Sequence, residues 1–153
     1  MIYIPNIERI SKIVDKYDIF ILDQWGVMHN GLIGYPHSID SVNNLVQLKK
    51  KIIIISNTSK RKETTIEKLA KLGFKKNDFF EVMTSGEIIW QNLYTRSHKF
   101  IKTLGPNCYY LFDKTKEDGL KYINGLDYNF VNNIENADFI LGCTPTSGFT
   151  TLD

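Results

Sequence analysis

Two short polar segments follow apolar runs of the sequence at positions where they could carry chemistry. Asp23 comes directly after the apolar residues 19–22, and Ser56 and Asn57 come directly after residues 52–55. A carboxylate at the carboxyl end of a buried parallel strand lies at the mouth of the sheet, where open α/β folds bind their ligands. Asp23 is therefore a candidate nucleophile or metal ligand. The alternative is an Asp that only caps the following turn.

The second segment completes an anion site. If the helix between the two strands makes one right-handed crossover, Ser56 and Asn57 lie beside Asp23 at the same edge of the sheet. A hydroxyl, an amide, backbone N–H groups and a helix N-terminus together suit a phosphate group. The alternative is that Ser56, Asn57 and Thr58 only cap the next helix, because these residue types all cap well.

The elements that must position these residues alternate along the chain. Apolar runs and turn residues predict strands at residues 19–22, 52–55, 79–83, 107–112, 126–131 and 139–141. Helical spacing of apolar residues predicts helices at residues 7–17, 38–48, 62–72, 88–94 and 115–123. Near-continuous apolar strands between amphipathic helices are typical of an α/β fold with a parallel sheet. Ser38 is a candidate N-cap, and Gly73 is a candidate C-cap.

Composition excludes several classes of protein. The 153 residues are 42% hydrophobic and 24% charged, as in an ordinary globular protein. A formal charge of +2 is too balanced for a nucleic-acid or membrane-surface partner. No apolar run approaches the roughly 20 residues that span a bilayer. Cys108 and Cys143 form no metal or disulfide pattern, so we expect free thiols and a cytoplasmic protein.

The polar segments resemble two motifs of the haloacid dehalogenase-like superfamily of phosphatases. Residues 20–27 match the first motif, an apolar run followed by Asp-x-Asp, except at one position, and residues 52–56 match the second. The stretch DQWGVMHNG at residues 23–31 resembles the class IIA members that carry Trp in the first motif. The resemblance implies a Rossmann-like α/β core whose N-terminal half is residues 1–86. Residues 87–153 would be the first part of an α/β C2-type cap, with the C-terminal half of the core absent.

The resemblance also implies a reaction. Asp23 would attack the phosphoryl group of a small phosphate ester and form an aspartyl-phosphate. Asp23 and the backbone carbonyl of Trp25 would bind Mg²⁺, which prefers oxygen ligands. Ser56 and backbone N–H groups near Asn57 would bind the phosphoryl oxygens, and such charge stabilisation dominates phosphoryl transfer.

The departures from the family pattern predict an impaired enzyme. The family's general acid stands two residues after the nucleophile, where this chain has Trp25. His29 is a candidate substitute, and its alternative role is to pack the loop. The family's third-motif Lys and fourth-motif acidic pair would follow Asp153, so the sequence indicates a truncated or split chain. An unpaired core edge would then favour a homodimer.

Three functions are compatible with these residues. The first is a haloacid dehalogenase-like phosphohydrolase, impaired or inactive in this chain. The second is a non-catalytic phosphate- or protein-binding relic of such an enzyme. The third is a receiver-type regulatory domain, whose acceptor Asp also ends a parallel strand. A receiver needs an acidic pair near its first strand and a Lys on its last, and neither is evident.

Overall fold

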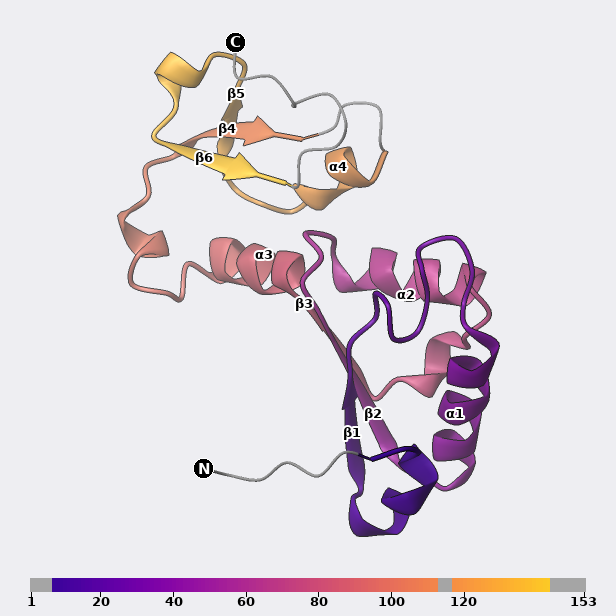
Figure 1. The fold of residues 1–153 in the computed structure, drawn as a ribbon. Helices are drawn as coiled ribbons and strands as arrows, with labels where there is room; N and C mark the ends of the chain where they lie inside the picture. Colours follow the sequence, from indigo (N-terminus) through magenta and orange to yellow (C-terminus); the bar gives the residue numbers. More distant parts are fainter. Residues whose placement is uncertain (1–6, 113–116, 144–153) are drawn as a thin grey trace. The chain divides into compact units, whose positions relative to one another are not determined.

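The computed structural model describes residues 7–112 and 117–143, and it divides into two compact units (Figure 1). The first unit comprises residues up to Ser56 together with Thr65–Met83. The second comprises Asn57–Thr64 together with the chain from Thr84 onward. The second unit thus includes a segment that precedes residue 86, and the expected division into a core half at residues 1–86 and a cap at residues 87–153 stays a prediction.

The first unit is built on a three-stranded sheet of order β1-β2-β3. Its strands are β1 (Ile19–Leu22), β2 (Lys51–Ser56) and β3 (Glu81–Thr84). β1 and β2 run parallel, with Ile19 opposite Lys51 and Leu22 opposite Ile54. The helix α1 (Pro36–Gln47) connects these two strands, as the strand–helix alternation predicts. Parallel pairing of this kind confirms the expected α/β class.

One face of this sheet forms the core of the first unit. Alternate strand residues point toward α1 and toward α2 (Lys62–Lys71), and the most deeply buried of them are Phe20, Ile52, Ile54 and Val82. They pack against Val42 and Leu45 of α1 and Leu69 of α2. Burying a side chain of this size contributes about 1.5–3 kcal/mol. This packing holds the carboxyl ends of β1 and β2 in place.

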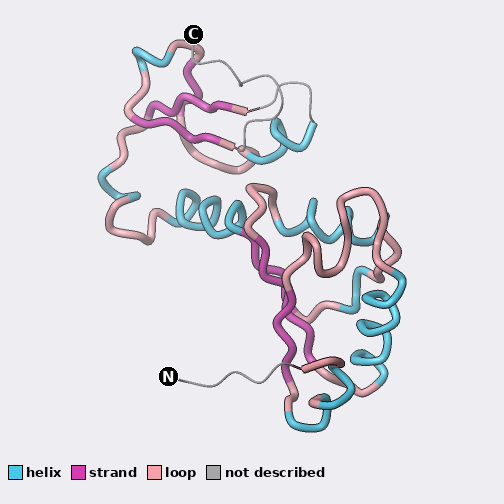
Figure 2. Tube along the Cα trace, viewed as in Figure 1, coloured by secondary structure: helices cyan, strands magenta, loops and turns pink. Residues whose placement is uncertain are grey.

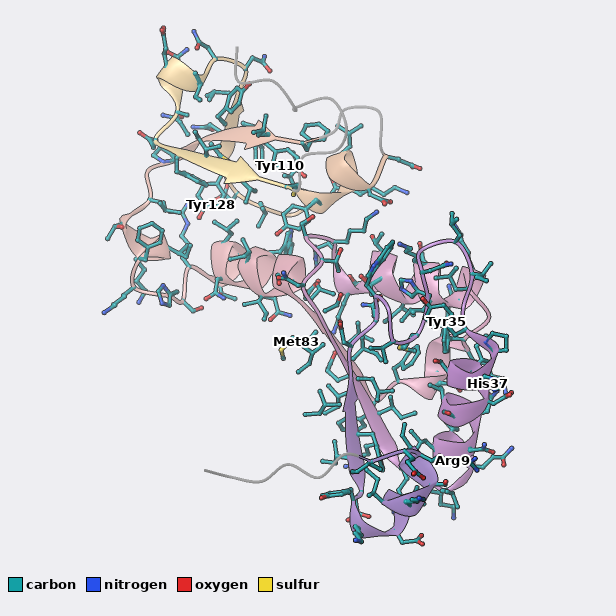
Figure 3. The ribbon with its side chains drawn as sticks, viewed as in Figure 1. Arg9, Tyr35, His37, Met83, Tyr110 and Tyr128 are labelled. Carbon is teal, nitrogen blue, oxygen red and sulfur yellow. The ribbon has the colours of Figure 1, made fainter. Side chains whose placement is uncertain are left out.

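The opposite face of the sheet is apolar and exposed. Ile19, Ile21, Ile55 and Met83 are between 44% and 62% exposed, and Met83 points away from α1 (Figure 3). β1 also lies at one edge of the described sheet. The homodimer expected from the sequence stays a prediction.

The predicted helix at residues 7–17 is wrong. The chain forms two short 3₁₀ turns there, η1 (Ile10–Lys12) and η2 (Val14–Lys16). Neither turn has a side-chain N-cap, and Ile13 between them has φ −126°, which is outside the helical range. Consecutive β-branched residues lose χ1 freedom in a helix, so the apolar spacing alone was not enough to form one.

Two capping predictions had different outcomes. Gly73 has φ +99°, the left-handed conformation expected of a glycine after a helix. Ser38 does not cap α1, because the helix begins at Pro36 and its N-cap residue is Tyr35. The Ser38 hydroxyl instead donates to the carbonyl of Val27, 2.7 Å away. It therefore ties α1 to the loop that follows β1.

The second unit has its own three-stranded sheet, of order β5-β4-β6 (Figure 2). The central strand β4 (Asn107–Leu111) runs parallel to both β5 (Asn129–Val131) and β6 (Phe139–Gly142). The helices of this unit are α3 (Ser85–Thr95) and α4 (Glu117–Tyr122), and it has two short 3₁₀ turns, η4 (Ile101–Thr103) and η5 (Ile134–Asn136). A third such turn, η3 (Lys76–Asp78), belongs to the first unit. The strand expected at residues 126–131 is shorter, and residues 115–116 of the helix expected at 115–123 lie outside the described residues. No described helix is long and apolar enough to cross a membrane.

The two cysteines of the second unit are free, as expected. Cys108 is buried in the core beside Tyr110 and Leu141. Burial raises the pKa of the Cys108 thiol to about 11. A thiol of that pKa is protonated at neutral pH and unreactive as a nucleophile.

Candidate active site

The parallel register brings Asp23 and Ser56 to neighbouring strand ends. Leu22 lies opposite Ile54, so Asp23 is level with Ile55 and one residue short of Ser56. With a strand spacing of about 4.8 Å and a rise of about 3.3 Å per residue, their Cα atoms lie about 6 Å apart. The register therefore places the backbones of Asp23 and Ser56 at neighbouring strand ends of the first unit, and the meeting of their side chains stays a prediction.

The Asp23 carboxylate is exposed, and one of its two oxygen atoms accepts a hydrogen bond. Its Oδ1 atom accepts a hydrogen bond of 2.7 Å from the N–H of Gln24. This contact stabilises the turn, which was the alternative role for Asp23. No described donor binds Oδ2, so that oxygen stays open to a ligand.

A tight loop follows Asp23 and is stabilised by hydrogen bonds within its own backbone. The carbonyl oxygen of Gln24 accepts from the N–H groups of Val27 and Met28 at 3.2 and 2.8 Å. Gly26 donates to the carbonyl of His29 at 2.9 Å and has φ +78°, a conformation that suits glycine. Met28 is only 1% exposed and anchors the loop in the core. The chain therefore returns toward the strand end within six residues of Asp23.

His29 is buried in this loop, at 2% exposure. Its Nδ1 atom accepts from the N–H of Gly31 at 2.9 Å, and its ring meets Trp25 edge-on at 5.8 Å between centroids. Burial and the charge of Lys68 lower the pKa of His29, while the charge of Asp23 opposes them. A neutral ring with Nδ1 accepting carries its proton on Nε2, which no described group accepts. This geometry fits the packing alternative, and a general-acid role stays a prediction.

The structure adds Lys68 to the candidate residues. Lys68 is on α2, and its charge and that of Asp23 both act on His29. Its Nζ atom lies 5.9 Å from the centre of the Trp25 ring. No described carboxylate forms an ion pair with it. Sequence reasoning missed Lys68 because a lysine on an amphipathic helix normally has only a solvated charge.

Asn57 is described with the second unit, apart from Asp23 and Ser56. Its Oδ1 atom accepts from the Ser85 hydroxyl at 2.9 Å. The carbonyl of Thr58 next to it accepts from the N–H of Gly86 at 3.0 Å. The segment after Ser56 is therefore held by the first turn of α3.

A buried ion pair completes this attachment. The Arg61 guanidinium donates to both carboxylate oxygens of Glu87, with N–O distances of 2.6 and 3.3 Å. Glu87 is 5% exposed and also accepts from the N–H of Lys62 at 3.1 Å. Lys62 is the first residue of α2, so Glu87 helps to cap that helix, a role that the sequence had offered to residues 56–58. The Arg61 guanidinium also lies 3.7 Å from the centre of the Trp90 ring.

Gly86 is required by the close approach of this segment. A Cβ atom at Gly86 would lie 2.1 Å from the carbonyl oxygen of Ser59, which is backbone and cannot rotate away. We expect Gly86→Ala to lower the free energy of unfolding of the second unit by about 1–3 kcal/mol, the usual cost of overpacking. Urea unfolding followed by tryptophan fluorescence measures it. Gly142→Ala is the control, because its Cβ meets nothing within 4 Å; equal losses in both variants would contradict the prediction.

The oxygen donors near Asp23 suit part of a cation site. Asp23 offers Oδ2, and no described N–H donates to the nearby carbonyl oxygen of Trp25. Carboxylate and carbonyl oxygens are hard ligands that Mg²⁺ accepts alongside water and substrate phosphate. Three acidic, His or Cys side chains do not gather anywhere among the described residues. Asp23 and Trp25 thus offer two oxygen atoms of the kind that Mg²⁺ binds, and a magnesium site formed by them stays a prediction.

Comparison with known proteins identifies relatives of this architecture. The model of the haloacid dehalogenase-like hydrolase family matches residues 20–122. A haloacid dehalogenase-like hydrolase of Brucella suis has a similar structure, with a TM-score of 0.73 at 22% identity, covering 90% of this chain and 46% of that one. A Caenorhabditis elegans protein whose name places it with the NipSnap proteins is 31% identical over 99 residues, which are 62% of this chain and 19% of that protein.

Two solved phosphatases share the fold at lower similarity. The glycerol phosphate phosphatase of Mycobacterium tuberculosis, in complex with calcium, has a TM-score of 0.58 at 16% identity, covering 88% of this chain and 37% of that one. The 4-nitrophenylphosphatase of Thermotoga maritima also has a TM-score of 0.58, at 24% identity, covering 85% of this chain and 46% of that one. The chain thus spans less than half the length of these solved proteins.

Proposed function

The chain belongs to the haloacid dehalogenase-like hydrolases, and from this membership we propose that it acts on a small phosphate ester with Asp23 as the nucleophile. One observation supports the proposal most directly: Asp23 and Ser56 end neighbouring parallel strands in the paired register. A carboxylate with one free oxygen and a hydroxyl at the next strand end suit nucleophilic attack on a phosphoryl group.

Each residue has a separate task in this proposal. The open oxygen of Asp23 attacks phosphorus, and the hydrogen bond from Gln24 to the other oxygen orients the carboxylate. The Ser56 hydroxyl donates to a phosphoryl oxygen as charge shifts toward it. The positive charge of Lys68 lowers the repulsion between the carboxylate and a phosphate dianion. None of these groups supplies a proton to the leaving group.

Mg²⁺ is the proposed cofactor. The Oδ2 atom of Asp23 and the carbonyl oxygen of Trp25 would hold it. When bound, the cation supplies positive charge that offsets the negative charge of the phosphate. With so few protein ligands, we expect weak binding of the metal.

The same site supports a second candidate, a phosphate- or protein-binding relic without turnover. Trp25 stands where the family places its general acid, and an indole donates no useful proton. General acid–base help is typically worth 10²–10⁴-fold in rate. The anion site formed by Asp23 and Ser56 does not depend on that acid, so phosphate could bind without being released from an ester.

A phosphatase assay on the 153-residue chain tests the proposal. We expect slow, Mg²⁺-dependent release of p-nitrophenolate from p-nitrophenyl phosphate, because this leaving group needs little protonation. Asp23→Asn should abolish it, whereas Asp40→Asn, at an exposed position of α1, should leave it unchanged. Brisk hydrolysis of a sugar phosphate that survives Asp23→Asn would refute the nucleophile assignment. Binding of inorganic phosphate with no turnover would favour the relic.

A further inference from the structure

The loop after Asp23 exposes a group of apolar side chains. Trp25 is 65% exposed, Val27 49%, Leu32 85% and Ile33 59%. Exposed apolar groups gathered at one place often mark ligand or partner sites. These four lie within ten residues of the candidate nucleophile. This loop therefore presents an apolar surface close in sequence to the candidate nucleophile.

The indole of Trp25 is held in place although it is exposed. Its six-membered ring lies against Gly31, where an added Cβ would come within 2.5 Å of Cζ3. The neighbouring His29 ring meets it edge-on at an interplanar angle of 87°. The side-chain oxygen of Asn30 accepts from the N–H groups of Leu32 and Ile33, each at 3.0 Å, and fixes the rest of the loop. A pre-organised aromatic surface binds a ligand at little entropic cost.

The surroundings of this indole carry charges that suit a phosphate ester. Asp23 is two residues away, at most about 7 Å along the backbone. The Lys68 ammonium lies 5.9 Å from the centre of the Trp25 ring. The flat apolar surface of the indole therefore lies near a cation that no described carboxylate neutralises, and it belongs to the loop that begins at the candidate nucleophile. An ester with an aromatic group on its phosphate combines both features.

We propose that Trp25 is a specificity-determining residue that stacks on the aromatic leaving group of an aryl phosphate monoester, with Lys68 attracting the phosphate. The substrate class is a monoester of a phenol. The proposal rests on the phosphohydrolase function proposed above. In this role Trp25 recognises the leaving group of the ester, which an acid at this position would otherwise have to protonate.

The chemistry explains why such a substrate fits a site without an acid. A phenol has a pKa near that of tyrosine, about 10, whereas water, a model for aliphatic alcohols, has one of 15.7. As the Asp23 oxygen bonds to phosphorus, the bond between phosphorus and the phenol oxygen breaks, and its electron pair leaves with the phenolate. The phenolate takes a proton from water. A second water then attacks the phosphorus of the aspartyl-phosphate, which restores the Asp23 carboxylate and releases inorganic phosphate.

Ligand binding to the full chain tests this role. Calorimetric titration with phenyl phosphate, methyl phosphate and inorganic phosphate, each with Mg²⁺, gives three dissociation constants. We expect phenyl phosphate to bind about 5- to 10-fold more tightly than methyl phosphate, because aromatic pairs in proteins contribute a free energy of this order. Trp25→Ala should bring this ratio close to one without changing the affinity for inorganic phosphate. Trp25→Phe should keep most of the preference.

Two further variants separate stacking from charge. Lys68→Met should weaken all three ligands by a similar factor and leave the ratio intact, and Lys68→Arg should restore them. Tyr94→Ala removes an exposed aromatic ring from the second unit and should change nothing. A phenyl preference that survives Trp25→Ala would overturn the proposal.

The result also distinguishes this proposal from the function on which it rests. If all three ligands bind equally to the wild-type chain, Trp25 has no recognition role and the phosphohydrolase proposal still stands. If none of them binds and Asp23-dependent hydrolysis is also absent, the phosphohydrolase proposal fails and the aryl specificity fails with it.

Discussion

Replacing Trp25 by Asp should raise the hydrolysis of alkyl phosphate esters relative to p-nitrophenyl phosphate by about 10²-fold, the lower end of what general acid catalysis provides. Trp25 occupies the position of the family's acid, and its side chain is 65% exposed, so a carboxyl group fits there although the contacts of the indole with Gly31 and His29 are lost. An alkoxide needs the proton that such an acid supplies, whereas p-nitrophenolate does not. The measurement is kcat/KM for a sugar phosphate and for p-nitrophenyl phosphate, in the wild-type chain and in the variant.

The matched control for this experiment is Trp25→Asn. It has nearly the same size as the Asp variant and lacks its acidic proton, so it should show no gain toward alkyl esters. Adding Asp23→Asn to the Asp variant should remove the gained activity, because the acid works only with the nucleophile. An equal gain in the Asn variant, or no gain in either, would show that the missing acid does not limit this site.

Glu87→Ala should destabilise the second unit by about 3–5 kcal/mol, the usual cost of leaving one partner of a buried ion pair uncompensated. The Arg61 side chain is only 20% exposed, so its guanidinium would lose its carboxylate with little access to water. The N–H of Lys62 would lose its acceptor as well. Urea unfolding gives the difference in free energy. Glu63→Ala is the control, because Glu63 is 61% exposed and lies 3.9 Å from Arg61, and exposed pairs contribute about 0–1 kcal/mol.

Glu87 also makes the free energy of unfolding depend on pH in the acid range. Burial disfavours the charged form of Glu87, but hydrogen bonds from Arg61 and from the Lys62 N–H outweigh it and lower the pKa of Glu87 below its ordinary 4.5. The folded chain therefore binds fewer protons than the unfolded chain as the pH falls past 4.5. The stabilisation is complete above that pH and is lost below it. Glu87→Gln should flatten this part of the stability curve, and an unchanged slope would assign the acid sensitivity to other carboxyl groups.

Local patterns in the sequence were enough to predict the strands of the core and the neighbouring positions of Asp23 and Ser56. Residues 19–22 and 52–55 are short, continuously apolar and followed by polar residues, and this local pattern predicted their strand character. Burial was predicted correctly for only one face, because Ile19, Ile21 and Ile55 lie exposed on the other. Once they pair in parallel through one crossover, Asp23 and Ser56 come to neighbouring strand ends because the carboxyl ends of parallel strands lie at one edge. No long-range information is needed for that inference.

The same local reasoning failed where two conformations compete over a few residues. Residues 7–17 have helical apolar spacing, yet their β-branched side chains and missing caps leave only two 3₁₀ turns. Spacing reports which side chains share a face, and it does not report the cost of holding them in a helix. The boundaries of β3 and β5 moved by two or three residues for a related reason, because strand ends depend on the partner strand.

Tertiary structure alone decided what surrounds the candidate nucleophile and what holds the following segment. Arg61 and Glu87 are 26 positions apart, and nothing in either neighbourhood of the sequence identifies the other as its partner. Lys68 comes to act on His29 only because α2 packs on the same unit as the loop after β1. Such contacts arise from the path of the whole chain, since a charged side chain finds its partner in space and not in sequence. The strand pattern thus determined where Asp23 and Ser56 lie, and the packing of distant elements brought the charge of Lys68 near Trp25 and His29.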